Sequence, residues 1–151
     1  MATLNRIYNH GKFVDFEYTT AADVYPGYIV ELTSAGTVQA HSTAGGLGEV
    51  LIVVENALEG IGITDVIDSG EVAQCYALTS GSTVQIRIAN GETIVIGDFL
   101  SSNGDGTFKK YVNDSSAVID EEVALMVALE AIDMSGSSAV DPDGFCIARK
   151  L

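Results

Sequence analysis

Short runs of aromatic and β-branched residues, separated by glycine-containing turns, restrict the fold of this chain more than any other feature. In residues 13–19, Asp15 and Glu17 alternate with Phe16 and Tyr18. This period of two is typical of a half-buried β-strand. The chain holds 16 glycines and only 2 prolines, which indicates many short connections. The sequence therefore predicts an all-β fold: a compact antiparallel β-sandwich or barrel of short strands with glycine-rich turns.

Further strands are predicted by the same criteria. Residues 28–32 lead through a turn at 34–36 to a returning strand at 37–39. Residues 49–54 are apolar after the first position, which predicts a strand buried on both faces. The remaining predicted strands are 72–78 and 83–88, expected to form a hairpin around Ser80 and Gly81, then 93–96, 99–100, 107–109 and 144–149.

A short pattern occurs twice, after Gly27 and after Gly97. Each glycine is followed by large apolar residues two and three positions later, a glycine at nine, a threonine at ten and an apolar residue at eleven. The first glycine allows a bend, and the second supplies the positive φ that a tight turn needs. Duplication and convergent turn chemistry both explain the match. Both predict two similar β-hairpins.

Residues 121–131 and residues 1–12 differ from the strands predicted above. Residues 121–131 have high helix propensity with Asp120 available as an N-cap, yet their continuous apolar run fits a buried strand equally well. Residues 1–12 are mostly polar and carry Arg6 and Lys12. We interpret them as an extended N-terminal arm that precedes a single β domain at residues 13–151.

The chain is strongly acidic, with 21 Asp and Glu against 7 Lys and Arg and a formal net charge of −14. Between Lys12 and Arg87 there is no Lys or Arg, whereas ten carboxylates lie in that interval. Nucleic acids and anionic membranes are bound mainly through basic residues, so we expect neither as a partner. Solubility explains the acidity, and so does charge complementarity with a basic partner.

The residues that chemistry would use lack the surroundings it needs. His10 lies in the polar arm, and His41 stands beside a Ser-Thr-Ala-Gly-Gly stretch in a chain without a serine elbow motif, so His41 is predicted to be a surface loop residue. The acidic stretches 103–106 and 141–144 lack the spacing of a calcium loop and are interpreted as tight turns. We therefore expect no enzyme activity, no cofactor and no metal.

The two cysteines, Cys75 and Cys146, form neither a metal motif nor a disulfide framework. Each has apolar neighbours, which predicts buried free thiols. Residues 1–6 lack the apolar stretch of a secretory signal, and no run approaches the roughly 20 apolar residues of a membrane span. We expect synthesis in a reducing host cytoplasm.

The segment 57–65 is loop-like but contains the large apolar residues Leu58, Ile61 and Ile63. Such side chains either fold over the core or form a patch that another subunit covers. The three residues are therefore candidates for a subunit interface.

Several segments, in this order, resemble the capsid decoration (cement) proteins of tailed bacteriophages. They are Asp23, Gly27 and residues 30–32, then 54–65, 69–74, 96–100, 104–107 and 127–135. The resemblance favours a strand at 121–131. It implies a compact β domain, often a homotrimer, that binds the major capsid protein on the outer surface of the virion and clamps neighbouring capsomers.

The resemblance does not reach the first twenty residues. We expect the arm to add a strand to a capsid sheet edge, with Arg6, Tyr8 and Lys12 as candidate capsid contacts. The alternative function is a virion-surface or tail-associated module that recognises a host glycan or protein.

Overall fold

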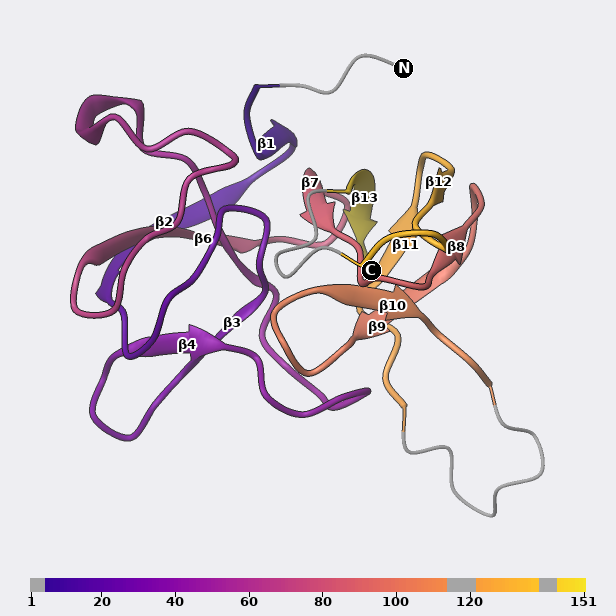
Figure 1. The fold of residues 1–151 in the computed structure, drawn as a ribbon, viewed down its shortest axis with the longest axis horizontal. Helices are drawn as coiled ribbons and strands as arrows, with labels where there is room; N and C mark the ends of the chain where they lie inside the picture. Colours follow the sequence, from indigo (N-terminus) through magenta and orange to yellow (C-terminus); the bar gives the residue numbers. More distant parts are fainter. Residues whose placement is uncertain (1–4, 114–121, 139–143) are drawn as a thin grey trace.

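The computed structural model describes residues 5–113, 122–138 and 144–151. These residues form short antiparallel strands, one 3-10 turn and no α-helix (Figure 1). The strands form several sheets in a sandwich-like arrangement, which confirms the all-β prediction. In chain order the elements are β1 (Tyr8–His10), β2 (Phe13–Thr19), β3 (Val30–Leu32), β4 (Val38–Ala40), β5 (Leu51–Val53), η1 (Ala57–Glu59), β6 (Val72–Leu78), β7 (Thr83–Arg87), β8 (Thr93–Ile94), β9 (Phe99–Ser102), β10 (Phe108–Lys110), β11 (Met126–Ala128), β12 (Ile132–Asp133) and β13 (Phe145–Lys150).

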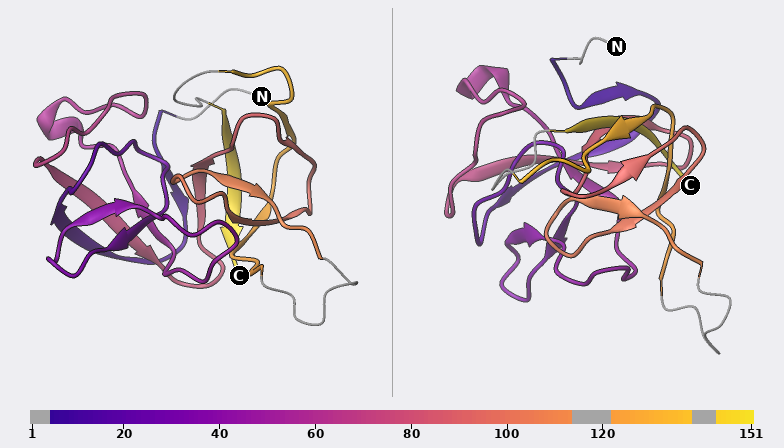
Figure 2. Two further views of the ribbon diagram at one scale, coloured as in Figure 1. Left: turned by 60° about the horizontal axis from the view of Figure 1, so that its bottom comes forward. Right: turned by 45° about the vertical axis from the view of Figure 1, so that its right-hand side comes forward.

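The strands divide into two lobes that lie side by side (Figures 1 and 2). Lobe 1 is residues 13–78 and lobe 2 is residues 83–151. In lobe 1 the strand order is β2-β6-β5, and a bridge between Ile29 and Ile52 connects β5 to the β3–β4 hairpin. In lobe 2 the order is β7-β13-β11-β9-β10. This order matches β2-β6-β5 followed by the β3–β4 hairpin in lobe 1, and lobe 2 has the β8–β12 pair in addition.

The two predicted hairpins are confirmed, and they share one register. Leu32 pairs with Val38 in β3–β4, and Ser102 pairs with Phe108 in β9–β10. These pairs occupy equivalent positions in the pattern that the sequence shows twice. The hairpins are therefore matching parts of the two lobes.

The repeat extends well beyond the hairpins. The N–H of Gly27 donates to the carbonyl of Val53 at 2.8 Å, and the N–H of Gly97 donates to the carbonyl of Ala128 at 2.9 Å. Three further pairs of N–H to carbonyl bonds correspond in the same way. Val53 to Tyr28 in lobe 1 matches Ala128 to Asp98 in lobe 2; Val54 to Gln74 matches Leu129 to Ile147; and Leu78 to Val50 matches Leu151 to Leu125. These bonds define which residue of lobe 2 is equivalent to which residue of lobe 1.

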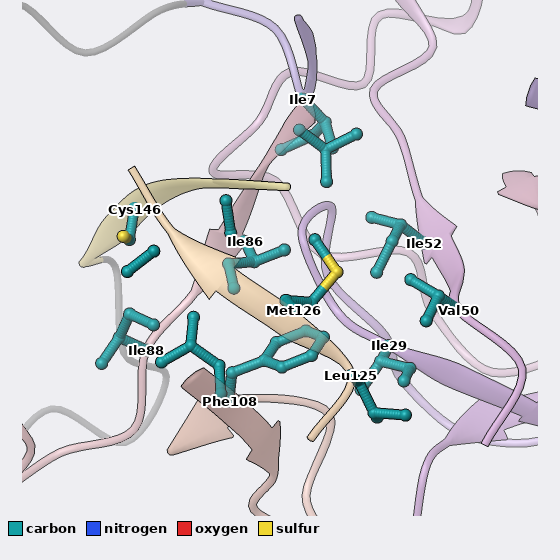
Figure 3. Packing of buried hydrophobic residues seen from close by; sticks show 14 of the residues in the cluster. Ile7, Ile29, Val50, Ile52, Ile86, Ile88, Phe108, Leu125, Met126 and Cys146 are labelled. Carbon is teal, nitrogen blue, oxygen red and sulfur yellow. The ribbon is translucent and has the colours of Figure 1, made fainter. Parts of the chain in front are cut away.

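The buried apolar side chains form two hydrophobic clusters, of which the larger joins the two lobes. The smaller lies within lobe 1 and includes Leu51, Val53 and Cys75. The larger fills lobe 2 and continues into the face of lobe 1 that packs against it (Figure 3). From lobe 1 it takes Ile29, Val50, Ile52, Val54 and Leu78. Strand β5 thus has one face in each cluster, which confirms the prediction of a strand buried on both faces.

The hairpin predicted from residues 72–88 is wrong. Strand β6 pairs with β2 and β5, whereas β7 pairs with β1 and β13. The glycine turn near Gly81 instead connects the last strand of lobe 1 to the first strand of lobe 2. Partners distant in sequence determine where these two strands pair.

The ambiguous segment 121–131 contains a strand. Strand β11 pairs with β9 on one side and β13 on the other, and no described residue of this segment is helical. Pairing on both sides prevails over the helix propensity of the segment.

The N-terminal arm expected at residues 1–12 is, from Ile7 onwards, part of the domain itself. Ile7 is fully buried in the larger cluster, and its N–H donates to the Glu55 carboxylate at 2.8 Å. Its carbonyl accepts from the N–H of Gln85 at 2.7 Å. Strand β1 then pairs with β7. This segment does add a strand to a sheet edge, but the sheet belongs to its own chain.

Candidate interaction surfaces

The candidate capsid contacts Arg6 and Lys12 are exposed at either end of β1. Their backbone is held in place by Gln85 in β7 and by Ser82 in the turn before it. The carbonyl of Arg6 accepts from Gln85 Nε2 at 2.7 Å, and the N–H of Lys12 donates to Ser82 Oγ at 3.0 Å. Two cationic side chains are thereby presented on one fixed segment of the surface.

The third candidate, Tyr8, is half-buried in an aromatic group. Its ring meets Phe13 edge-on with centroids 4.8 Å apart, and Phe13 stacks on Tyr76 at 3.8 Å. The hydroxyl of Tyr8 donates to the Gly11 carbonyl at 2.8 Å. Burial, followed by the nearby charge of Asp15, raises the pKa of Tyr76. Tyr8 therefore contributes mainly to packing between the N-terminal segment and lobe 1.

The three interface candidates of the 57–65 segment separate. Leu58 lies in η1 and is 99% exposed. Ile61 packs against the cluster within lobe 1, and Ile63 packs against the larger cluster. Of the three, only Leu58 has a fully exposed side chain.

The prediction that His41 is a surface loop residue is wrong, because His41 is only 2% exposed. Its Nδ1 lies 2.7 Å from Ser102 Oγ, and its Nε2 lies 3.4 Å from the Leu47 carbonyl and 3.8 Å from a Glu31 carboxylate oxygen. Gly48 makes room for the ring, since a Cβ there would be 2.9 Å from Nε2.

The types of residue around His41 resemble those of a serine hydrolase, but a nucleophilic serine must reach its substrate. Ser102 is fully buried, and its hydroxyl also accepts from the N–H of Gly104 at 3.2 Å. Nearby, the N–H of Gly45 donates to the Ser102 carbonyl at 2.8 Å. This arrangement holds the segment after β4 against lobe 2.

Arg87 is a structural residue that the sequence reasoning missed. It is 1% exposed, with its guanidinium over Tyr25 at 5.0 Å and Phe145 at 4.8 Å from the ring centroids. Nε donates to the carbonyl of Pro26, and Nη2 to that of Ile63, each at 2.8 Å. Arg87 belongs to lobe 2, whereas Tyr25, Pro26 and Ile63 belong to lobe 1. A single basic residue inside an apolar strand was the available signal.

The cysteines are buried free thiols, as predicted. Burial raises the pKa of Cys75 to about 12 and that of Cys146 to about 11. In the described parts of the chain no group of three or more His, Cys, Asp or Glu side chains is placed to hold a metal ion. No helix there has the length and apolar character to span a membrane.

Among the described residues, exposed apolar side chains gather on β2 and at the turn between β8 and β9, and the sequence reasoning named neither group. On β2, an edge strand with β6 as its sheet neighbour, Val14 and Phe16 are exposed. At the turn between β8 and β9, Val95 is 52%, Ile96 69% and Phe99 48% exposed.

Comparison with protein-family models and with curated proteins finds no match. A solved structure does share the fold: the N base of head fiber gp8.5 in bacteriophage phi29. The similarity has a TM-score of 0.57, covers 93% of this chain and 95% of that chain, and comes with 12% sequence identity. This chain therefore shares its fold with that solved structure over nearly the whole length of both.

Proposed function

We propose that this chain is a structural protein of a phage head. It binds the major capsid protein on the outer surface and clamps neighbouring capsomers, without catalysis. The observation that carries the proposal is the fold, which matches the base of a phage head fiber over 93% of this chain. The ordered sequence segments that resemble capsid decoration proteins support it independently.

The surface of the molecule suits this role. Lobe 1 contains ten carboxylates and no Lys or Arg, whereas Arg6 and Lys12 stand together on the N-terminal segment. On a shell that carries many copies, even a weak contact per copy reinforces the whole. The candidate capsid contacts remain Arg6, Tyr8 and Lys12, of which the two cationic side chains are exposed.

The test uses heads purified without this protein, incubated with the full chain. Occupancy is measured by sedimentation and gel densitometry, and clamping is measured as the temperature at which heads release their DNA. Saturable binding with a raised release temperature supports both parts of the proposal. Binding without a raised release temperature contradicts the clamping of capsomers, and the absence of binding contradicts a role on the phage head.

Contact residues are tested by the double variant Arg6→Ala and Lys12→Ala. Deletion of the whole segment is unsuitable, because Ile7 belongs to the core. The matched control is Arg149→Ala, which removes an exposed cation from β13. Weaker binding in the double variant alone supports the assignment, whereas equal binding in all three proteins contradicts it.

The alternative role, a virion-surface module that recognises a host glycan or protein, has one observation in its favour. Phe16 is exposed on β2 and stacks on Tyr18 with centroids 5.7 Å apart. Binding to host cells or their glycans that Phe16→Ser abolishes, together with no binding to heads, would favour this role.

A further inference from the structure

Lobe 1 has an apolar face that lobe 2 covers completely. Its residues Pro26, Ile29, Val50, Ile52, Val54 and Leu78 are all buried. The face is held by hydrogen bonds between the lobes as well as by packing. The N–H of Ile29 donates to the Gly106 carbonyl at 2.9 Å, and the N–H of Arg87 donates to the Gly27 carbonyl at 3.2 Å.

The equivalent residues of lobe 2 form a face that we call the outer face. The backbone hydrogen bonds that define the repeat place Ile96, Phe99, Leu125, Val127, Leu129 and Leu151 at the six corresponding positions. All six are apolar. Leu125 is buried in the larger cluster at 6% exposure, and Val127 and Leu129 are half-buried, whereas Ile96 is 69%, Phe99 48% and Leu151 46% exposed. Scattered exposed apolar residues are ordinary. A set that reproduces an interface position by position indicates a partner.

The two glycines at the centres of these faces show the difference directly. Gly27 and Gly97 have φ of 92° and 91°. A Cβ on Gly27 would lie 3.1 Å from the Arg87 side chain and 3.2 Å from the Phe145 ring, whereas a Cβ on Gly97 would meet nothing within 4 Å. The same turn is packed in lobe 1 and uncovered in lobe 2.

The receiving surface also has a counterpart. Lobe 2 receives lobe 1 through Arg87, Gly106 and Phe145. Strand register and the hairpin pattern make Thr19, Gly36 and Val72 their equivalents in lobe 1. All three are exposed. Each chain thus has a partly uncovered face on lobe 2, where Ile96, Phe99 and Leu151 are exposed, and an uncovered receiving surface on lobe 1.

We propose that the outer face of lobe 2 docks on lobe 1 of a second copy of this chain, continuing between molecules the packing that joins the two lobes within one. The contact is heterologous, so it closes into a ring or extends into a chain of copies. It concerns self-association alone and holds whether or not the protein binds phage heads.

The test measures molar mass by light scattering for the full chain and for Ile96→Asp, Val72→Asp and Leu58→Asp. The wild type is expected to be larger than a monomer. Ile96→Asp disrupts the outer face and Val72→Asp disrupts the receiving surface, so each variant is expected to be monomeric. Leu58→Asp removes an exposed apolar residue outside both surfaces and is expected to keep the wild-type mass. Circular dichroism and thermal unfolding establish that each variant is folded.

Mixing the two monomeric variants tests the head-to-tail geometry. Val72→Asp retains an intact outer face, and Ile96→Asp retains an intact receiving surface. An equimolar mixture is therefore expected to form a two-copy species and nothing larger. Should either variant fail to fold, Ile96→Ser and Val72→Ser replace it. A monomeric wild type, an unchanged mass in Ile96→Asp, loss of assembly in Leu58→Asp alone, or no complex in the mixture would overturn the proposal. Binding to heads is measured separately, so its failure is distinguishable from these outcomes.

Discussion

The backbone of Gly106 lies directly against the ring of Tyr28, where a Cβ on residue 106 would be 2.7 Å from Cγ. Gly36 holds the equivalent place in the other hairpin and has nothing within 4 Å of its own Cβ position. Both glycines have positive φ, 90° and 78°. The pair separates the effect of backbone conformation from the effect of packing between lobes.

This contrast predicts that alanine substitutions at the two glycines lower the free energy of unfolding by different amounts. Gly36→Ala is expected to lower the free energy of unfolding by about 1–2 kcal/mol, because a Cβ disfavours positive φ. Gly106→Ala adds a collision with Tyr28 and is expected to lower it by a further 1–3 kcal/mol or so. Urea unfolding followed by tyrosine fluorescence measures both, and equal losses would show that the lobes do not meet here.

Replacing Arg87 with methionine removes the donors that serve the Pro26 and Ile63 carbonyls. Buried carbonyls left without a donor are costly, so we expect Arg87→Met to lower the free energy of unfolding by about 2–4 kcal/mol. Arg149→Met, at an exposed position, is expected to change it by less than about 0.5 kcal/mol. Denaturant titration compares them. Similar values for the two variants would argue against a structural role for Arg87.

Ile7 distinguishes an integrated strand from a free arm. Because Ile7 is fully buried among residues of both lobes, Ile7→Ala is expected to lower the free energy of unfolding by about 2–4 kcal/mol. Arg6→Ala, one residue away and exposed, is the control and is expected to have almost no effect. Differential scanning calorimetry detects the change. An unshifted melting temperature in Ile7→Ala would restore the arm interpretation.

The thiols are expected to be unreactive in the folded protein. A pKa of about 12 for Cys75 and about 11 for Cys146 reduces the thiolate at pH 8 by roughly a thousandfold and a hundredfold relative to an ordinary thiol. A disulfide reagent such as DTNB should label neither at a measurable rate until urea unfolds the chain. Cys146→Ser and Cys75→Ser report on one thiol each, and rapid labelling of native Cys146→Ser would contradict the burial of Cys75.

Glu122 gives stability a dependence on pH. Burial raises its pKa, but hydrogen bonds from Lys109 and the N–H of Val112 outweigh burial, and the pKa falls below its ordinary value of 4.5. The contribution to stability is therefore present above pH 4.5 and is lost as the pH falls through the lowered, folded value.

Lys109 Nζ lies 2.6 Å from Glu122 Oε1, and both side chains are about a quarter exposed. Lys109→Gln is expected to lower the free energy of unfolding by less than about 1 kcal/mol at pH 7. The difference from wild type should shrink below pH 4.5. Urea titrations across this range check the trend. Lys12→Gln, which removes an exposed cation from the N-terminal segment, should show no such trend, and a constant difference for Lys109→Gln would exclude the ion pair as its cause.

The sequence predicted local features well because they depend on neighbouring residues. Alternation identified the strand β2, although the prediction that it is half-buried is wrong, because Phe16 is exposed. Glycine spacing identified the β3–β4 and β9–β10 hairpins. The short repeated pattern pointed to two similar hairpins but not to two similar lobes. Outside the hairpins the lobes share backbone hydrogen bonds between residues of different types, such as Val53 and Ala128.

Long-range partners account for what the sequence reasoning missed. A single apolar residue in a polar segment gave no sign that Ile7 lies in the core, and the turn at Gly81 resembled a hairpin although its strands pair elsewhere. His41 is buried because the segment after β4 crosses to Ser102 in the other lobe. The outer face depends on the equivalence of the two lobes, which backbone hydrogen bonds define and which residue types outside the hairpins do not reveal.

The absence of Lys and Arg from lobe 1 has a consequence for work with proteases and labels. Trypsin has no site between Lys12 and Arg87, so complete digestion yields the whole of lobe 1 within one long peptide from Phe13 to Arg87. In the folded chain Arg87 itself is shielded by the contact between the lobes. Reagents that modify lysine side chains will therefore mark lobe 2 and the N-terminal segment while leaving lobe 1 untouched, and surface footprints of an assembly must rely on carboxylate chemistry to see it.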